Sequence, residues 1–174
     1  MGEANYYSKI KRIQNKVNSV INFIDKANQL FIVILMVGMT SVVLLQVFRR
    51  YVLNSALLWP EELARYLQIW LTFCGAAVAL KAGEHVGVEA IIQLIPEGVQ
   101  RFIRLLFKIV VVIFLLVFIK FSWVVAVMNV SSTSMALGIS FFWVRMALPV
   151  GGLLMLLAQL GNIFNDIVEI TTSG

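Results

Sequence analysis

The sequence predicts an all-α integral membrane protein with four transmembrane helices, an amphipathic N-terminal helix and a short interfacial helix between the second and third spans. Hydrophobic residues make up 60% of the 174 residues and charged residues only 13%, which is far from the composition of soluble domains. Apolar segments of about 20 residues, each long enough to cross a bilayer, recur along the chain. They leave little room for a globular domain.

Residues 1–26 have the pattern of a basic amphipathic helix. Apolar residues recur there at close to a helical period, and basic residues lie between them: Lys9, Lys11, Arg12, Lys16 and Lys26. We expect this helix to lie on the membrane surface and to lead into the first span. It has no small-residue cleavage site after a short apolar run, so we do not expect a removable signal peptide.

The membrane domain is expected at residues 27–168, followed by a short tail at 169–174. Its spans are predicted at about 27–50, 58–82, 97–130 and 142–166. The first span carries no charge until it ends in Arg49, Arg50 and Tyr51. Basic and aromatic residues of this kind mark the headgroup level of a membrane.

The second span opens with an unusual charged cluster, in which Trp59 and Pro60 precede Glu61, Glu62 and Arg65. Exposing such charges to hydrocarbon costs roughly 2.5–3.5 kcal/mol each, so they must face protein or water. On a helix either glutamate can reach the guanidinium. Pro60 suits a first helical turn, where the helix dipole also favours the carboxylates. The cluster is therefore a helix start with an internal ion pair, an interface that buries the charges against a partner, or both.

Small residues in the second span, Gly75, Ala76 and Ala79, offer surfaces for close helix contact. Aromatic residues share a broad face of the same span, and at this spacing packing is a better explanation than a ligand site. Trp59 and Trp70 belong to this face.

Lys81, Gly83 and His85 are expected to form a structural turn after the second span, with the glycine as a cap. The apolar segment 86–95 that follows is too short to cross a bilayer, so we expect a helix that lies in the interface. A single histidine without a partner cluster is a weak signal for a ligand or a base.

The third and fourth spans each contain residues that interrupt the apolar pattern. Lys120 either extends its amine toward the nearer surface or pairs with Glu61 or Glu62. In the fourth span, Pro149, Gly151 and Gly152 predict a kink or the close approach of a neighbouring helix.

The orientation of the chain follows from its basic residues. With a cytoplasmic N-terminus, that side holds the lysines and arginine of the first segment together with Lys81, Arg101, Arg104 and Lys108. The opposite side holds fewer basic residues, namely Arg49, Arg50, Arg65, Lys120 and Arg145. The positive-inside rule therefore predicts that both termini are cytoplasmic.

The few cysteines and histidines exclude several classes of membrane enzyme. Cys74 is the only cysteine and His85 the only histidine, so neither an intrachain disulfide nor a haem with two histidine ligands from this chain is possible. We expect no cofactor, no metal site and no enzymatic activity. The net charge of +5 comes from basic residues at helix ends, so we expect no nucleic-acid partner.

The sequence, with its four predicted spans, resembles the small membrane subunit (Q or DctQ type) of tripartite ATP-independent periplasmic (TRAP) transporters. The resemblance covers nearly the whole chain. It is carried by Gln46 to Arg50 before Asn54-Ser55, by Trp59-Pro60-Glu61-Glu62-Leu63-Ala64-Arg65, by Phe73-Cys74-Gly75-Ala76, by Lys81-Ala82-Gly83-Glu84-His85-Val86, and by Ala147-Leu148-Pro149.

The resemblance implies a non-catalytic subunit of the bacterial inner membrane. In such systems a periplasmic binding protein delivers an organic acid to a large membrane subunit, which moves it by a sodium-driven, elevator-type motion. The small subunit packs on the fixed scaffold of the large one and enlarges it. Sialic acid is the favoured substrate of the complex, and C4-dicarboxylates come next.

Within that reading, two groups of residues are candidates for contacts with partners. The first group would contact the large subunit. Its polar clamp consists of Glu61, Glu62, Arg65 and Lys120, and the tryptophans that would contact the large subunit or lipid are Trp59, Trp70 and Trp123. Arg49 and Arg50 are candidates for contact with the docked binding protein, where charge would steer the encounter.

Two other functions remain open from the sequence. The chain could be a stand-alone homodimeric transporter that uses Glu61 or Glu62 as its coupling carboxylate, because membrane-embedded acidic residues serve this purpose. A membrane enzyme comes third, since the histidines and cysteines that such enzymes use are missing.

Overall fold

The computed structural model describes residues 2–55, 57–82 and 97–173, and the regular elements in these ranges are helices. They are α1 (Gly2–Tyr51), α2 (Trp59–Lys81), α4 (Glu97–Met128), α5 (Phe141–Arg145) and α6 (Ala147–Ser173). Four helical stretches are long and apolar enough to cross a membrane: Gln14–Tyr51, Trp59–Lys81, Ile103–Met128 and Phe141–Val168. The prediction of an all-helical protein with four candidate spans is therefore confirmed.

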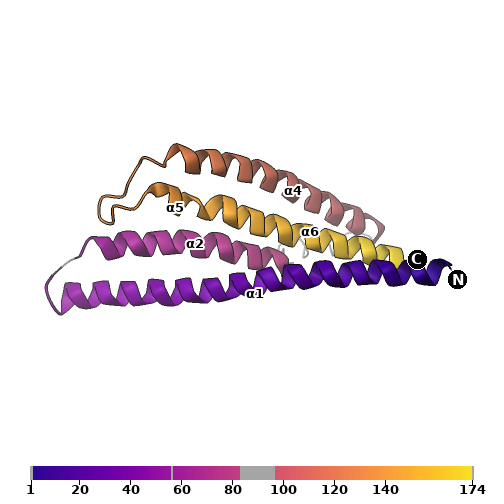
Figure 1. Ribbon diagram of the computed structural model, residues 1–174, viewed down its shortest axis with the longest axis horizontal. Coiled ribbons are helices and arrows are strands. Elements are labelled where there is room, and N and C mark those ends of the chain that lie inside the picture. Colours follow the sequence, from indigo (N-terminus) through magenta and orange to yellow (C-terminus); the bar gives the residue numbers. More distant parts are fainter. Residues whose placement is uncertain (1, 56, 83–96, 174) are drawn as a thin grey trace.

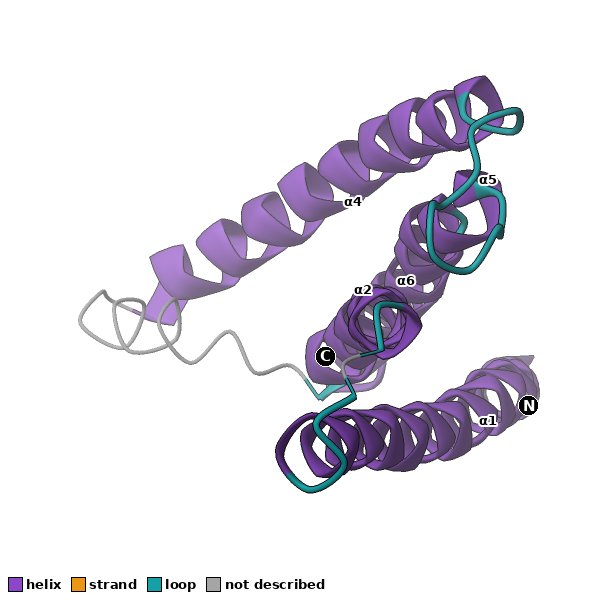
Figure 2. Ribbon diagram, turned by 90° about the vertical axis from the view of Figure 1, so that its left-hand side faces the viewer, coloured by secondary structure: helices purple, strands orange, loops and turns teal. Residues whose placement is uncertain are grey.

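The long helices run lengthwise along the molecule and alternate in direction, so that the N- and C-termini lie at the same end (Figure 1). We call this the terminal end. The opposite loop end holds residues 52–55 and 57–58 between α1 and α2, and the loop 129–140. Helix α6 lies in the middle, because it packs against α2, α4 and α1, whereas α4 packs mainly against α6 and α5 (Figures 1 and 2).

Helix α1 is longer than the sequence predicts, because it continues from Gly2 to Tyr51 without a break. The boundary expected at residue 26 is therefore not a boundary between two helices. No proline occurs in this stretch, and Gly38 is its only glycine after Gly2, so nothing interrupts the helix. The first part of α1 packs on α6, where Asn18 Nδ2 donates to Asn165 Oδ1 at 3.0 Å.

Glycines let α6 approach its neighbours closely, as expected for the fourth span. A Cβ added to Gly151 would lie 2.5 Å from Phe73 Cβ of α2, and one added to Gly152 would lie 2.8 Å from Ile119 Cγ1 of α4. Gly75 makes no close contact within this chain, because nothing lies within 4 Å of an added Cβ there, so its predicted contact with another helix stays a prediction. Gly75 lies on the outer side of α2, away from the bundle.

The fourth span is divided at Met146, which separates α5 from α6. Pro149 explains the break. It has no N–H to donate to the carbonyl of Arg145, and its ring crowds that same carbonyl. Ser140 caps the start of α5, since its hydroxyl accepts from the backbone N–H of Phe142 at 3.2 Å and donates to the carbonyl of Val130 at 2.7 Å.

The interfacial helix expected at 86–95 and the turn residues Gly83 and His85 lie outside the described residues. Lys81 is described and is the last residue of α2. The residue at the C-cap of this helix is Ala82, whose N–H donates to the carbonyl of Val78 at 3.0 Å.

Replacing Gly151 with alanine tests the role of close packing around α6. We expect Gly151→Ala to destabilise the chain by about 1–3 kcal/mol, the usual cost of overpacking, because the new methyl group collides with Phe73. Thermal unfolding of the purified chain in detergent measures this change. Gly75→Ala is the control, since its methyl group enters open space. Equal melting temperatures for the two variants would contradict this packing.

Candidate functional site

The charged cluster at the start of α2 has the local geometry that the sequence predicts. Pro60 lies in the first turn of α2, and Glu61 and Glu62 are the acidic residues of that turn. Arg65 Nη2 lies 3.3 Å from Glu61 Oε1, and both side chains are about two-thirds exposed. This ion pair is formed between residues i and i+4 of the same helix, so it needs no partner chain.

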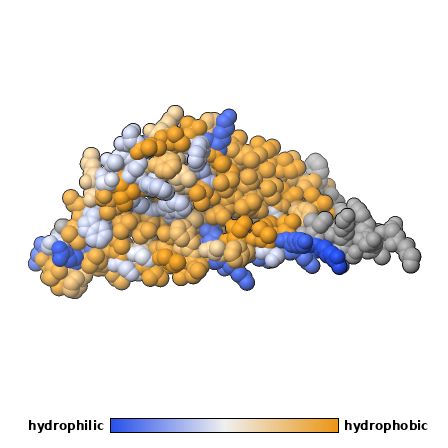
Figure 3. All heavy atoms as spheres, in the orientation of Figure 1, coloured by the Kyte–Doolittle hydropathy of each residue, from blue (hydrophilic) through white to orange (hydrophobic). Residues whose placement is uncertain are grey.

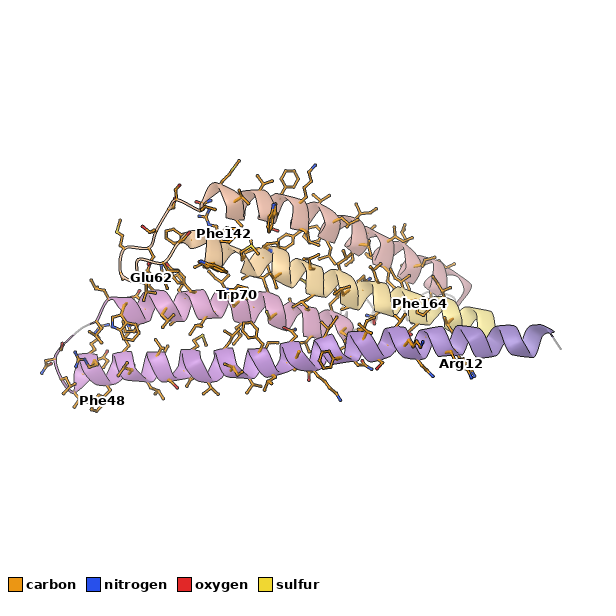
Figure 4. All side chains as sticks on the ribbon, in the orientation of Figure 1. Arg12, Phe48, Glu62, Trp70, Phe142 and Phe164 are labelled. Atoms are coloured by element: carbon orange, nitrogen blue, oxygen red, sulfur yellow. The ribbon has the colours of Figure 1, made fainter. Side chains whose placement is uncertain are left out.

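Glu62 has a different role from its neighbour. It accepts a hydrogen bond from the Tyr66 hydroxyl, and its Oε2 accepts the backbone N–H of Ala136 at 3.0 Å. Ala136 lies in the loop that leads into α5, so Glu62 fastens this loop to α2. Figure 4 shows Glu62 at the loop end of the bundle.

Lys120 does not pair with Glu61 or Glu62, so that alternative from the sequence is wrong. Its side chain is exposed on α4, and it forms no ion pair within the part of the chain that is described. The physical reason is that both carboxylates already have partners on α2 or in the adjoining loop. The other reading, in which the amine extends to the nearer surface, is compatible with this exposure.

The three candidate tryptophans differ in their surroundings. Trp70 is half-buried and packs edge-on against Phe31 of α1, with ring centroids 5.9 Å apart at 89°. Trp59 is half-buried at the start of α2. Trp123 is 49% exposed on α4 and so remains available to lipid or to another protein.

Arg49 and Arg50 form the last turn of α1 at the loop end. Arg50 is exposed, and its guanidinium carbon lies 5.7 Å from the centroid of the Tyr51 ring. Arg49 points partly inward, because its Nε is buried and has no hydrogen-bond partner among the described residues. Arg50 is therefore the better placed of the two to contact a docked protein.

Polar contacts between helices gather at the terminal end of the bundle, and sequence reasoning missed most of them. Lys81 Nζ lies 2.8 Å from Asp25 Oδ2 and 2.9 Å from Asn22 Oδ1, which joins α2 to α1. Lys108 of α4 pairs with Asp166 of α6. The only sequence signal for these contacts was the recurrence of polar residues every three or four positions on otherwise apolar helices.

Buried amides extend this network toward the middle of the bundle. Asn28 Nδ2 donates to the carbonyl of Cys74 at 2.9 Å, and Asn162 Nδ2 donates to the carbonyl of Leu80 at 3.1 Å. Gln159 is buried, with 2% of the residue exposed, and its Nε2 donates to the carbonyl of Lys108 at 3.4 Å. These donors bond to carbonyls on neighbouring helices, and such bonds hold helices together in a membrane.

The cavity between α1, α2 and α6 is too small for an organic substrate. The cavity lined by Asp25, Asn28 and Lys81 has a volume of about 20 Å³, enough for a single water molecule. Ligand pockets are typically about 300–1,000 Å³. The described residues also contain no group of three or more histidine, cysteine or acidic side chains that could hold a metal ion.

Residues 39–169 match the family model described as "Tripartite ATP-independent periplasmic transporters, DctQ component". The chain belongs to the DctQ family. It is therefore a transport protein and not an enzyme. With four apolar helices, this DctQ protein is a multi-pass protein of the bacterial inner membrane.

Three relatives of this DctQ protein show the range of the family. The sialic acid TRAP transporter small permease protein SiaQ of Vibrio cholerae is 33% identical over 142 residues, which cover 82% of each chain. The sialic acid TRAP transporter permease protein SiaT of Haemophilus influenzae is 30% identical over 138 residues, which are 78% of this chain but 22% of SiaT. The C4-dicarboxylate TRAP transporter small permease protein DctQ of Vibrio cholerae is 27% identical over 51% of this chain and 38% of its own.

The neighbouring glutamates of α2 provide a matched pair of variants. We expect Glu62→Ala to lower the melting temperature of the subunit, because it frees the loop at Ala136 and removes the partner of the Tyr66 hydroxyl. Glu61→Ala should change it little, since exposed ion pairs contribute little to stability. Thermal unfolding of both variants measures the difference. A larger effect of Glu61→Ala would contradict this assignment.

Proposed function

We propose that this chain is the non-catalytic small membrane subunit of a TRAP transporter, which packs on the scaffold of a large elevator-type subunit and enlarges it. The large subunit then carries out sodium-driven uptake of an organic acid that a periplasmic binding protein delivers. The relationship to SiaT supports the proposal most strongly. There a segment similar to 78% of this chain makes up 22% of a longer permease, which supports a role beside a larger membrane subunit.

The interior of the bundle supports the role of a helper. The cavity between α1, α2 and α6 has room for a single water molecule, and the glycines of α6 bring the helices too close for a substrate path there. Transporters bind their substrates near the middle of the membrane, often at interrupted helices. The break in this chain at Met146 lies instead at the loop end, next to α5. The substrate path therefore belongs to the partner subunit.

Sialic acid is the favoured substrate of the complete transporter. The small permease protein SiaQ, which is similar over 82% of this chain, is named as part of a sialic acid transporter. C4-dicarboxylates come next, because the DctQ relative from the same organism is similar over about half of the chain. The cavity between α1, α2 and α6 is too small to bind either substrate, so we assign substrate selection to the partner proteins.

The proposed orientation places both termini in the cytoplasm and the loop end at the periplasm. The basic residues of the first part of α1 then lie near the anionic inner surface of the membrane, and membrane lipids are partners of this segment. Lys81, Gly83 and His85 mark the cytoplasmic turn. Arg49 and Arg50 lie at the periplasmic rim, where the binding protein docks.

Reconstitution in liposomes tests the proposal directly. The chain alone should move no sialic acid or C4-dicarboxylate under a sodium gradient, whereas the chain together with the large subunit and binding protein should accumulate one of them. Flux by the chain alone would favour a stand-alone homodimer with Glu61 or Glu62 as its coupling carboxylate. The structure gives that alternative little support, because both carboxylates are already engaged in contacts within the chain.

Reversing the charge at Arg50 tests the docking of the binding protein. We expect Arg50→Glu to slow binding-protein-dependent uptake while the membrane complex stays assembled, because rim charges mainly steer encounter and fix register. The control is Arg12→Glu, which reverses an exposed basic residue near the other end of the same helix. Initial uptake rates measure the effect, and a normal rate for Arg50→Glu would remove this residue from the docking surface.

A further inference from the structure

The outward face of α2 differs from the rest of the bundle surface. The exposed residues of this helix are Glu61, Arg65, Gln68, Thr72 and Ala79. They are spaced by three, four or seven positions, so they form one line along the helix, and half-buried Gly75 falls on the same line. We call these six residues the α2 stripe. Every member is charged, polar or small.

The other three long helices expose large apolar side chains instead. Exposed leucine, valine, isoleucine, methionine and phenylalanine residues recur along α1, α4 and α6, for example Leu44, Val117 and Leu160. In α2, whose residues are all described, no large apolar side chain is exposed. Figure 3 shows how apolar residues cover most of one side of the molecule. Faces of that kind suit lipid, whereas the α2 stripe does not.

The stripe crosses the middle of the membrane, where a polar side chain has no water to bond. Helix α2 has 23 residues, and Gln68 and Thr72 lie near its centre. The Thr72 hydroxyl bonds within the helix to the carbonyl of Gln68 at 2.8 Å. The Gln68 carboxamide forms no hydrogen bond to the described part of the chain, although lipid offers it no partner. It therefore requires a partner outside this chain.

The stripe is also shaped for close contact with another helix. Nothing lies within 4 Å of a Cβ added to Gly75, so its surface is open, and Ala79 follows one turn later. Small residues at such spacing let helix backbones approach in membranes, and an amide beside them can bond across the interface. The opposite face of α2 is already used, because Cys74 and Ala77 are buried inside the bundle.

We infer that the α2 stripe is the surface on which a transmembrane helix of the large subunit packs, with a hydrogen-bonding side chain opposite Gln68. This inference rests on the proposed function and adds the face of contact to it. The kind of partner follows from the relationship to SiaT, in which a segment similar to this chain is part of a longer permease. The exposed faces of α4 then contact lipid. Glu61 and Arg65 neutralise each other, so the partner needs no charge at that level.

Site-specific photo-crosslinking in the assembled complex tests this face. A photoreactive amino acid is placed at Gln68 or Thr72 of the stripe, and at Val117 or Phe121 of α4 as controls. These controls are matched in depth, because Phe118 of α4 stacks on Phe73 of α2 with ring centroids 5.8 Å apart. All four positions are exposed, so the probe does not disturb the packing of the bundle. We expect crosslinks to the large subunit from the stripe and none from α4.

Each other outcome overturns the inference in a distinguishable way. If the complex purifies intact but crosslinks arise from α4, or from neither helix, the contact face is wrong and the proposed function stands. Crosslinks between two copies of this chain would show that the stripe contacts a second copy and not the large subunit. If the wild-type chain does not co-purify with the large subunit, the proposed function fails, and this inference fails with it.

A second variant measures the contribution of the carboxamide. We expect Gln68→Leu to reduce the fraction of the chain that stays with the large subunit through detergent purification, while Val117→Leu leaves it unchanged. The melting temperature of the isolated chain should be the same for both variants, because neither side chain is buried in the bundle. Full retention of Gln68→Leu would show that the carboxamide does not join the two subunits.

Discussion

Hydrocarbon offers no hydrogen-bond partners, and this constraint governs how every polar group in the bundle is placed. Inside the bundle, the amides of Asn28, Gln159 and Asn162 donate to carbonyls on neighbouring helices. At the loop end, the Glu62 carboxylate accepts a hydrogen bond from the backbone N–H of Ala136. Among the described residues, the chain supplies no partner for Asn28 Oδ1, for Arg49 Nε or for the Gln68 carboxamide of the α2 stripe. A partner that covers this stripe would supply the bond that Gln68 lacks.

Helix α6 sets the shape of the bundle because its small residues let two helices approach it at once. Gly151 accommodates α2 and Gly152 accommodates α4, so these helices pack on α6 while α4 makes little contact with α1. In a membrane, close packing replaces the hydrophobic effect as the force between helices. This arrangement leaves one side of α2 uncovered, which is why its outward face can serve a second protein. This uncovered side of α2 is the face that we propose for the contact with the large subunit.

Local features could be predicted from the sequence, whereas contacts between distant residues could not. Helical spacing alone predicts the pair Glu61–Arg65. Pro149, Gly151 and Gly152 predict the close approach of α6 to its neighbours. The contact between Lys81 and Asp25 joins residues 56 positions apart, and no pattern in one sequence predicts such a pairing. The position of Gly75 could not be predicted from its residue type, because a small residue suits either a contact inside the bundle or an outward surface. Only the burial of its neighbours distinguishes these two positions.

The central claim is that the outward face of α2 is covered by protein and not by lipid. Spin labels at Ala79 and at Leu157 report the accessibility of each site to oxygen, which concentrates in the hydrocarbon. Both side chains are exposed, and Leu157 of α6 lines the same small cavity as Ala77 and Lys81 of α2, so the depths are similar. In nanodiscs with the chain alone, both labels should be accessible. Addition of the large subunit should shield the label at Ala79 and leave the one at Leu157 unchanged; continued access at Ala79 in the assembled complex would contradict the account.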